Sequence, residues 1–122
     1  LDEARMAISD KHASISDIPQ RILNLTKEKF VTITLGSKGS IAANTKKNSF
    51  LMPAITKTTV DTMGAGDAYF AISSPVLYLT KSIELSSLVG NTAGAIQVGI
   101  PGLGNPLNKL KLLRYCNTLL KV

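Results

Sequence analysis

The sequence has few of the residues that support metal, redox or disulfide chemistry. Among 122 residues it contains one cysteine, Cys116, and one histidine, His12. A single cysteine excludes an internal disulfide, which is in keeping with a reducing compartment such as the cytoplasm. Zinc and similar metals are held by clusters of cysteine and histidine, and the sequence has no such cluster. Cys116 is expected to pack within a helix interface, and His12 to lie at the surface.

Long hydrophobic runs and a secretory signal are also missing. No apolar stretch approaches the roughly 20 residues that a membrane-spanning helix needs, so no membrane partner is expected. Hydrophobic residues make up 44% of the chain and charged residues 18%, a balance that suits a globular core and excludes disorder. The length suits one domain. The first residue is Leu1 rather than methionine, so the chain is expected to be a processed or truncated part of something longer.

The charge is biased toward basic residues. Fourteen lysines and arginines against eight acidic residues give a formal net charge of +6. These basic residues are scattered and do not form a stripe with interleaved aromatic residues, so nucleic acid is not an expected partner. They are expected to lie on solvated helix faces and loops, with a mild attraction for anionic ligands as a side effect.

The pattern of hydrophobic residues predicts an α/β layer architecture. A strand of β-branched residues is followed by a hairpin, and helical patterns precede and follow them. Pro53 indicates that the third extended segment is an edge strand or a strand end. The predicted elements are helices over 1–8 and 14–29, extended segments over 30–35, 41–44 and 50–55, and helices over 67–82, 82–99 and 107–122.

Two of these segments carry expectations about burial. The strand over 30–35 is continuously apolar, so it is expected to be buried on both faces. The helix over 67–82 is apolar nearly all round, which predicts that it is buried. Pro75 lies inside this helix and is expected to kink or split it near Ser73 and Ser74.

The segment VDTMGAGDAYF, residues 60–70, leads from an extended segment into a helix through very small residues. The first N–H groups of a helix have no intrahelical partner, and the helix dipole adds partial positive charge there. Gly64, Ala65 and Gly66 have side chains too small to block access, so the segment predicts an anion cradle that suits a phosphate. Asp67 follows in the first turn, where a carboxylate suits a general base toward a hydroxyl that attacks the phosphate.

A simpler interpretation of the same segment remains open. The three small residues can form an ordinary tight turn, and Asp67 can be an acid that complements the helix dipole. A second glycine pair, Gly36 and Gly39 in TLGSKG, favours a ligand site because it ends a strand where α/β proteins bind ligands. By itself that pair is more typical of a hairpin turn, and the Gly-Lys-Ser/Thr ending of a P-loop is absent.

Together, VTITLGSKGS at 31–40 and VDTMGAGDAYF at 60–70 resemble the C-terminal signature of the ribokinase-like (PfkB) carbohydrate kinases. In that family a strand ending in Thr-Leu-Gly-x-x-Gly is followed by Asp-Thr-x-Gly-Ala-Gly-Asp-Ala-Phe. The spacing between the two motifs and the small-residue helix NTAGAIQVG also fit, so the resemblance covers nearly the whole chain. It implies a ribokinase-like three-layer helix/sheet/helix sandwich, of which this chain would be the C-terminal, nucleotide-binding portion. It also implies a phosphotransferase that uses ATP and Mg²⁺.

The resemblance implies roles for individual residues. Asp67 would be the catalytic base toward a hydroxyl of a sugar or sugar phosphate. The backbone N–H groups of Gly64, Ala65 and Gly66 would form the anion hole for the transferred phosphoryl group. Contacts with ATP would come from Thr34, Gly36, Gly39 and Asn91, the last through an amide that bonds a base edge or the ribose.

Two cation sites also follow from the resemblance. K⁺ would lie between Asp61, the carbonyl of Met63 and the carbonyls of residues 99–105. Mg²⁺ would lie near Glu3, if LDEARMA aligns with the Asn-x-x-Glu motif of the family. An acid at a helix N-terminus explains Glu3 about as well.

The main departure from the family is length. Members are more than twice as long as this chain, and their N-terminal half supplies the sugar-binding residues and a lid. The sequence therefore leaves three situations open: a missing N-terminal half, a homodimer, or a non-catalytic nucleotide-binding or interaction module derived from such a kinase. The segments AGAIQVG and LNKLKLLRYCNTLL resemble the branch of the family near the heptose-phosphate kinases.

Overall fold

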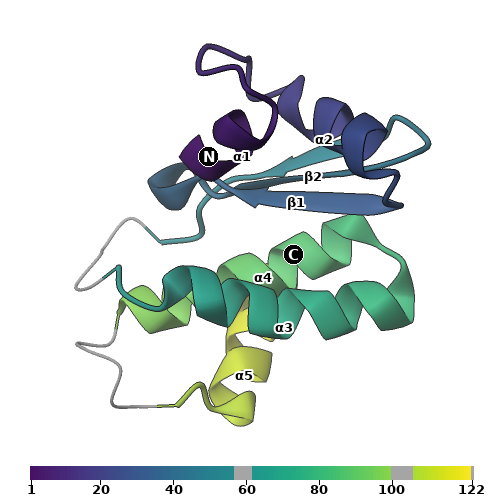
Figure 1. Cartoon of the computed structure of the whole chain (residues 1–122). Helices are drawn as coiled ribbons and strands as arrows, with labels where there is room; N and C mark the ends of the chain where they lie inside the picture. The colour runs from purple at the N-terminus through teal and green to yellow at the C-terminus, as the bar shows by residue number, and fades with distance from the viewer. Residues whose placement is uncertain (57–61, 100–105, 122) are drawn as a thin grey trace.

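The computed structural model describes residues 1–56, 62–99 and 106–121 (Figure 1). Two helices precede a small sheet and three follow it. The helices are α1 (Asp2–Ala7), α2 (Ile18–Thr26), α3 (Ala65–Thr80), α4 (Ile83–Val98) and α5 (Lys109–Leu120). The strands are β1 (Phe30–Thr34), β2 (Ser40–Asn44) and β3 (Ser49–Met52), with a 3₁₀ turn, η1 (Gly36–Lys38), between the first two. No helix in these described ranges is both long and apolar enough to cross a membrane.

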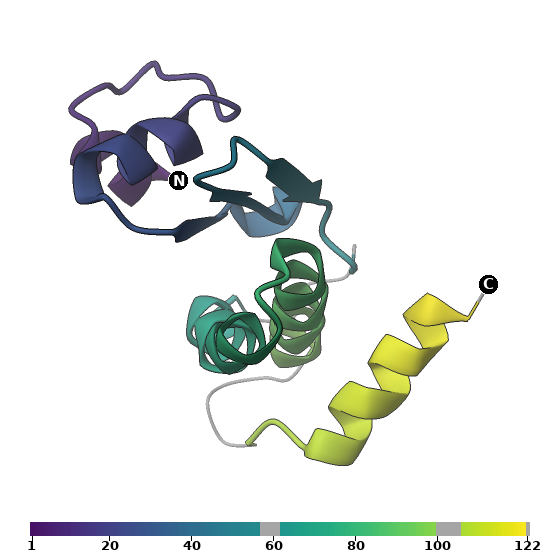
Figure 2. The same cartoon turned by 90° about the vertical axis from the view of Figure 1, so that its right-hand side faces the viewer.

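The elements stack in layers, with the sheet in the middle. Helices α1 and α2 lie on one face of the sheet, and the pair α3 and α4 lies on the other (Figure 1). Helix α5 packs against the outer side of α4, as the rotated view in Figure 2 makes clear. The α/β layer architecture predicted from the sequence is confirmed.

The sheet is an antiparallel meander in the order β1-β2-β3. The predicted hairpin is confirmed, and β3 ends at Met52, directly before Pro53. The central strand β2 is the buried one, since its residues from Ser40 to Ala43 are all inaccessible. In β1 only Ile33 is buried, so the prediction that this strand is covered on both faces is wrong. The reason is that α2 covers one face of β1, whereas on the other face α4 packs against β2 and β3 and leaves β1 partly exposed.

Two hydrophobic clusters are present in the described part of the chain, one on each side of the sheet. The first lies under α1 and α2 and is built around Ile18 and Ile33. The second joins Ile96 of α4 to Leu112 of α5, with Cys116 packed at its edge. Cys116 therefore lies at a helix interface, as the sequence predicts.

Helix α3 differs from the prediction in two respects. It runs without a break through Pro75, so the helix is not split. Its apolar residues are not buried all round, because Phe70, Tyr78 and Leu79 are 44%, 74% and 78% exposed. The cause is tertiary: α3 packs along α4 on one side, and nothing in the described part of the chain covers its opposite face.

Candidate functional site

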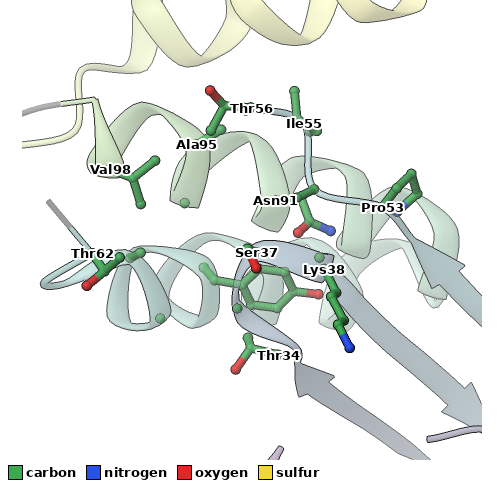
Figure 3. A pocket seen from close by; sticks show the side chains of 17 residues that line it. Thr34, Ser37, Lys38, Pro53, Ile55, Thr56, Thr62, Asn91, Ala95 and Val98 are labelled. Atoms are coloured by element: carbon green, nitrogen blue, oxygen red, sulfur yellow. The ribbon is translucent and has the colours of Figure 1, made fainter. Parts of the chain in front are cut away.

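A cavity of about 660 Å³ opens where the β1–β2 turn, the segment after β3, the start of α3 and one face of α4 meet (Figure 3). Its size is within the range of pockets that hold small organic ligands. It brings together residues that the sequence assigned to one nucleotide site although they are far apart along the chain. Those that line it are Thr34, Gly36, Gly39, Ala65, Gly66 and Asn91.

The turn between β1 and β2 forms one rim of the cavity. Gly36 has a φ of 60° and Gly39 a φ of 100°, in the left-handed region that favours glycine. A Cβ atom on Gly39 would lie 2.0 Å from the carbonyl oxygen of Met52. Glycine is therefore needed for the turn to lie against the end of β3, and Ser37 and Lys38 between the two glycines also line the cavity.

The first turn of α3 forms the facing rim. Gly64 is its N-cap with a φ of 77°, and no side chain caps this helix. Within the described ranges, the N–H groups of Gly64, Gly66 and Asp67 have no backbone acceptor. The N–H of Ala65 differs, because it donates to the Thr62 carbonyl at 3.3 Å. Unpaired helix donors of this kind attract an anion.

Asp67 does not line the cavity, although it is next to a residue that does. It is the third residue of α3, it is exposed, and it directly follows Gly66, which does line the cavity. Its carboxylate forms no ion pair or hydrogen bond with any described residue. In a capping box, an acid at this position would accept a hydrogen bond from the Gly64 N–H, and that bond is absent as well. The carboxylate is therefore available to a ligand.

Asn91 of α4 is held by a partly buried hydrogen-bond network that the sequence analysis missed. Its Nδ2 donates to Ser40 Oγ at 2.8 Å and to the Ser87 carbonyl at 3.0 Å. Ser40 Oγ also accepts from the hydroxyl of Tyr69 at 3.1 Å. Burial raises the pKa of the Tyr69 phenol, so this hydroxyl stays protonated and remains a donor.

An apolar wall, also missed from the sequence, closes the other side of the cavity. It consists of Pro53, Ala54, Ile55, Ala95 and Val98. A signal for two of these five residues was present, because Asn91, Ala95 and Val98 are spaced four and three residues apart and so share one helix face. An apolar wall opposite a few polar groups accommodates a flat ring whose edge carries hydrogen-bonding atoms.

The predicted cation ligands lie only partly within the described residues. Asp61 and residues 100–105 lie outside the described residues, and Met63 is exposed just before α3. Glu3 is exposed on α1 and does not line the cavity. The start of α1 is nevertheless close to it, because the Leu1 ammonium donates to the Thr34 carbonyl at 3.2 Å. No three acidic, histidine or cysteine residues among those described lie close enough to hold a metal ion.

Comparison with protein families identifies one match. Residues 1–110 match the family described as pfkB family carbohydrate kinase. No curated protein sequence is significantly similar to the chain.

Several solved structures share the fold. Phosphofructokinase-2 from Escherichia coli in complex with potassium matches with a TM-score of 0.83 and 21% identity, over 97% of this chain and 38% of that one. Ribokinase from Arabidopsis thaliana complexed with ribose and ATP matches with a TM-score of 0.79 and 24% identity. The match covers 93% of this chain and 38% of the ribokinase. Ribokinase from Thermotoga maritima matches with a TM-score of 0.80 and 22% identity. The match covers 94% of this chain and 38% of that ribokinase. The ribokinase-like fold is confirmed, and the chain spans 38% of the length of each of these proteins.

Proposed function

The chain belongs to the pfkB family of carbohydrate kinases, and we propose that it is the C-terminal, nucleotide-binding portion of an ATP-dependent sugar kinase. The reaction transfers the γ-phosphoryl group of ATP to a hydroxyl of a sugar or sugar phosphate. Because the chain spans 38% of the length of its structural relatives, the sugar-binding residues come from a further part of the polypeptide or from a second copy. The heptose-phosphate branch stays a prediction for the identity of the sugar.

The observation that carries the proposal is the composition of the cavity. One rim is the start of α3, where Gly66 borders the cavity and the N–H groups of Gly66 and Asp67 are unpaired within the described ranges. The opposite end has an apolar wall with the polar Asn91 beside it. A nucleoside triphosphate needs both kinds of surface, because its phosphates are anionic and its base is a flat apolar ring with polar edges.

The roles of the residues follow from this placement. Asp67 accepts the proton of the attacking sugar hydroxyl as the hydroxyl oxygen bonds to the γ-phosphorus. The bond from the γ-phosphorus to the bridging oxygen breaks, and ADP leaves. The backbone N–H groups at the start of α3 offset the negative charge on the transferred phosphoryl group. Thr34, Gly36 and Gly39 border the rest of the nucleotide.

In the proposed reaction, cations compensate phosphate charge and shape the site rather than act on the sugar. Mg²⁺ bound to the nucleotide would offset phosphate charge, but the described residues do not assemble a ligand set for it. The potassium in the Escherichia coli phosphofructokinase-2 structure supports a K⁺ site built from Asp61, the Met63 carbonyl and the carbonyls of residues 99–105. That site would shape the start of α3 without touching the sugar.

A second candidate is a nucleotide-binding module without catalysis. The short coverage of the relatives favours it, since a chain that lacks a sugar-binding part would bind ATP and transfer nothing. The exposed Asp67 favours the kinase, because a binding module does not need a carboxylate beside an anion site.

The test is the Asp67→Asn variant of the complete kinase that contains this chain. We expect kcat to fall by about two to four orders of magnitude, the usual contribution of a general base, with little change in ATP affinity or melting temperature. Glu84→Gln is the matched control, because Glu84 is also an exposed acid in the first turn of a helix but lies away from the cavity. Turnover of Asp67→Asn equal to that of Glu84→Gln would remove Asp67 from the mechanism.

A further inference from the structure

Tyr69 of α3 lines the candidate nucleotide cavity and is fixed against α4. Its side chain is 3% exposed. It packs against α4 at Gly90, where an added Cβ atom would lie 2.8 Å from the Tyr69 ring. The ring therefore has no room to move toward α4, and its hydroxyl is directed at Ser40, which is completely buried at the start of β2.

The Ser40 hydroxyl, which is bonded to Tyr69, also bonds the Asn91 amide and so helps to fix its orientation. The Ser40 hydroxyl oxygen has two lone pairs, and it accepts from both the Tyr69 hydroxyl and Asn91 Nδ2. The Asn91 amide also faces the Ser87 carbonyl at 3.0 Å. A carbonyl oxygen only accepts, so the Asn91 atom next to it must be the nitrogen. The orientation of the amide is thereby determined by its surroundings.

Both hydrogens of the Asn91 amide are consumed by these two bonds. The atom left for a ligand is Oδ1, which only accepts hydrogen bonds. In Figure 3 the Asn91 oxygen lies on the side of Val98 and Thr62, within the ring of lining side chains, and the nitrogen lies on the side of Pro53. The cavity consequently presents an acceptor, and no donor, at this position.

From this geometry we infer that Tyr69 and Ser40 are positioning residues, which hold Asn91 so that the cavity selects a nucleotide with a hydrogen-bond donor opposite Oδ1. The inference rests on the proposed nucleotide site and adds its selectivity. The donor is the exocyclic 6-amino group of adenine or a ribose hydroxyl. A 6-oxo purine places an acceptor where the amino group stands, so two acceptors would face each other.

The first experiment measures binding of four nucleotides to the unaltered chain by calorimetry: ATP, inosine triphosphate, 2′-deoxy-ATP and 3′-deoxy-ATP. We expect ATP to bind about fivefold tighter than the analogue that lacks the donor, which is the usual net effect of one hydrogen bond. Loss with inosine triphosphate identifies the 6-amino group, and loss with a deoxy analogue identifies a ribose hydroxyl. Equal binding of all four overturns the inference and leaves the nucleotide site intact, whereas binding of none overturns both.

The second experiment tests the positioning residues through the same ratio. Tyr69→Phe keeps the buried ring and removes only the hydroxyl, and Ser40→Ala removes the shared acceptor. In both variants we expect the ratio of the dissociation constants, that of the weaker-binding analogue over that of ATP, to fall toward one. If the two residues have a purely structural role, the substitutions would lower the melting temperature and weaken the binding of all four nucleotides equally, so that the ratio would not change. An unchanged ratio in both folded variants would overturn the inference.

Discussion

At the scale of single residues, Gly39 and Gly66 border the same cavity for different reasons. Gly39 has a φ of 100°, and an added Cβ atom would lie 2.0 Å from the Met52 carbonyl oxygen. Gly66 is in the first turn of α3, and no described atom lies within 4 Å of a Cβ added there. The first glycine is required by the fold, while the second is required only if a ligand must approach the backbone.

We therefore expect opposite responses to alanine at these two positions. Gly39→Ala should lower the free energy of unfolding by about 1–3 kcal/mol, through backbone strain and the clash with β3. Gly66→Ala should leave it unchanged or raise it by up to about 1 kcal/mol, because alanine is the better helix former. Urea denaturation measures both.

The two variants also separate fold from ligand binding. The methyl group of Gly66→Ala would stand in the space that the anion site needs, so ATP affinity should fall although stability does not. The prediction would be contradicted if Gly39→Ala did not change the free energy of unfolding, or if Gly66→Ala bound ATP with normal affinity.

At the scale of elements, the helices differ in how their first N–H groups are satisfied. Ser82 Oγ accepts from the Leu85 N–H at 3.1 Å and so caps α4. Asn108 Oδ1 accepts from the Leu110 N–H at 2.8 Å and caps α5. Helix α3 starts at Gly64, which has no side chain to offer. The helix start that borders the cavity is thus one whose donors remain available to a ligand.

The cap of α4 should be worth a measurable amount of stability. Ser82→Ala removes the acceptor and is expected to lower the free energy of unfolding by about 1 kcal/mol, whereas Ser82→Gly should cost only a few tenths. Ser74→Ala is the control, because Ser74 is exposed in the middle of α3 and caps nothing. Thermal unfolding that shows the same change for Ser82→Ala and Ser74→Ala would mean that the cap contributes no stability.

At the scale of the whole molecule, no described strand pairs with the outer edge of β1, where the Thr34 carbonyl accepts from the Leu1 ammonium. The Leu35 N–H donates to the Gly39 carbonyl, so Leu35 and, by alternation, Ile33 direct their backbone groups toward β2. The intervening Thr32 and Thr34 direct theirs to the other edge, where no described strand pairs. An edge without a strand partner beside a half-exposed α3 is a place where a further strand can pair, which supports the proposal that more polypeptide completes the kinase.

Hydrogen exchange should reveal this edge in the 122-residue chain. The amide protons of Thr32 and Thr34 are expected to exchange at least about tenfold faster than those of Ile33 and Leu35, because only the latter are bonded within the sheet. NMR-detected exchange resolves the four residues individually. Equally slow exchange at all four would mean that the edge is already covered, and a dependence on protein concentration would identify a second copy of the chain as the cover.

The sequence by itself determined the local features of this protein. The turn at Gly36 and Gly39 and the end of α4 around Gly99 were predicted correctly, and Pro53 correctly indicated a strand end, although the extended segment was predicted to continue to residue 55. The family could also be recognised, because its two glycine motifs are continuous stretches of chain. Such features depend on backbone preferences and hydrogen bonds within a few residues, which the order of amino acids specifies directly.

Only the tertiary structure decided the burial of α3 and the chemistry at Asn91. The apolar pattern of α3 predicts burial, but burial depends on what lies over each face, and in the described chain α3 packs mainly along α4. The orientation of the Asn91 amide depends on Ser40, 51 residues away, and Ser40 in turn on Tyr69, 29 residues away. Contacts across such separations exist only once the layers have packed, so no local pattern in the sequence could reveal which atom of Asn91 faces the cavity.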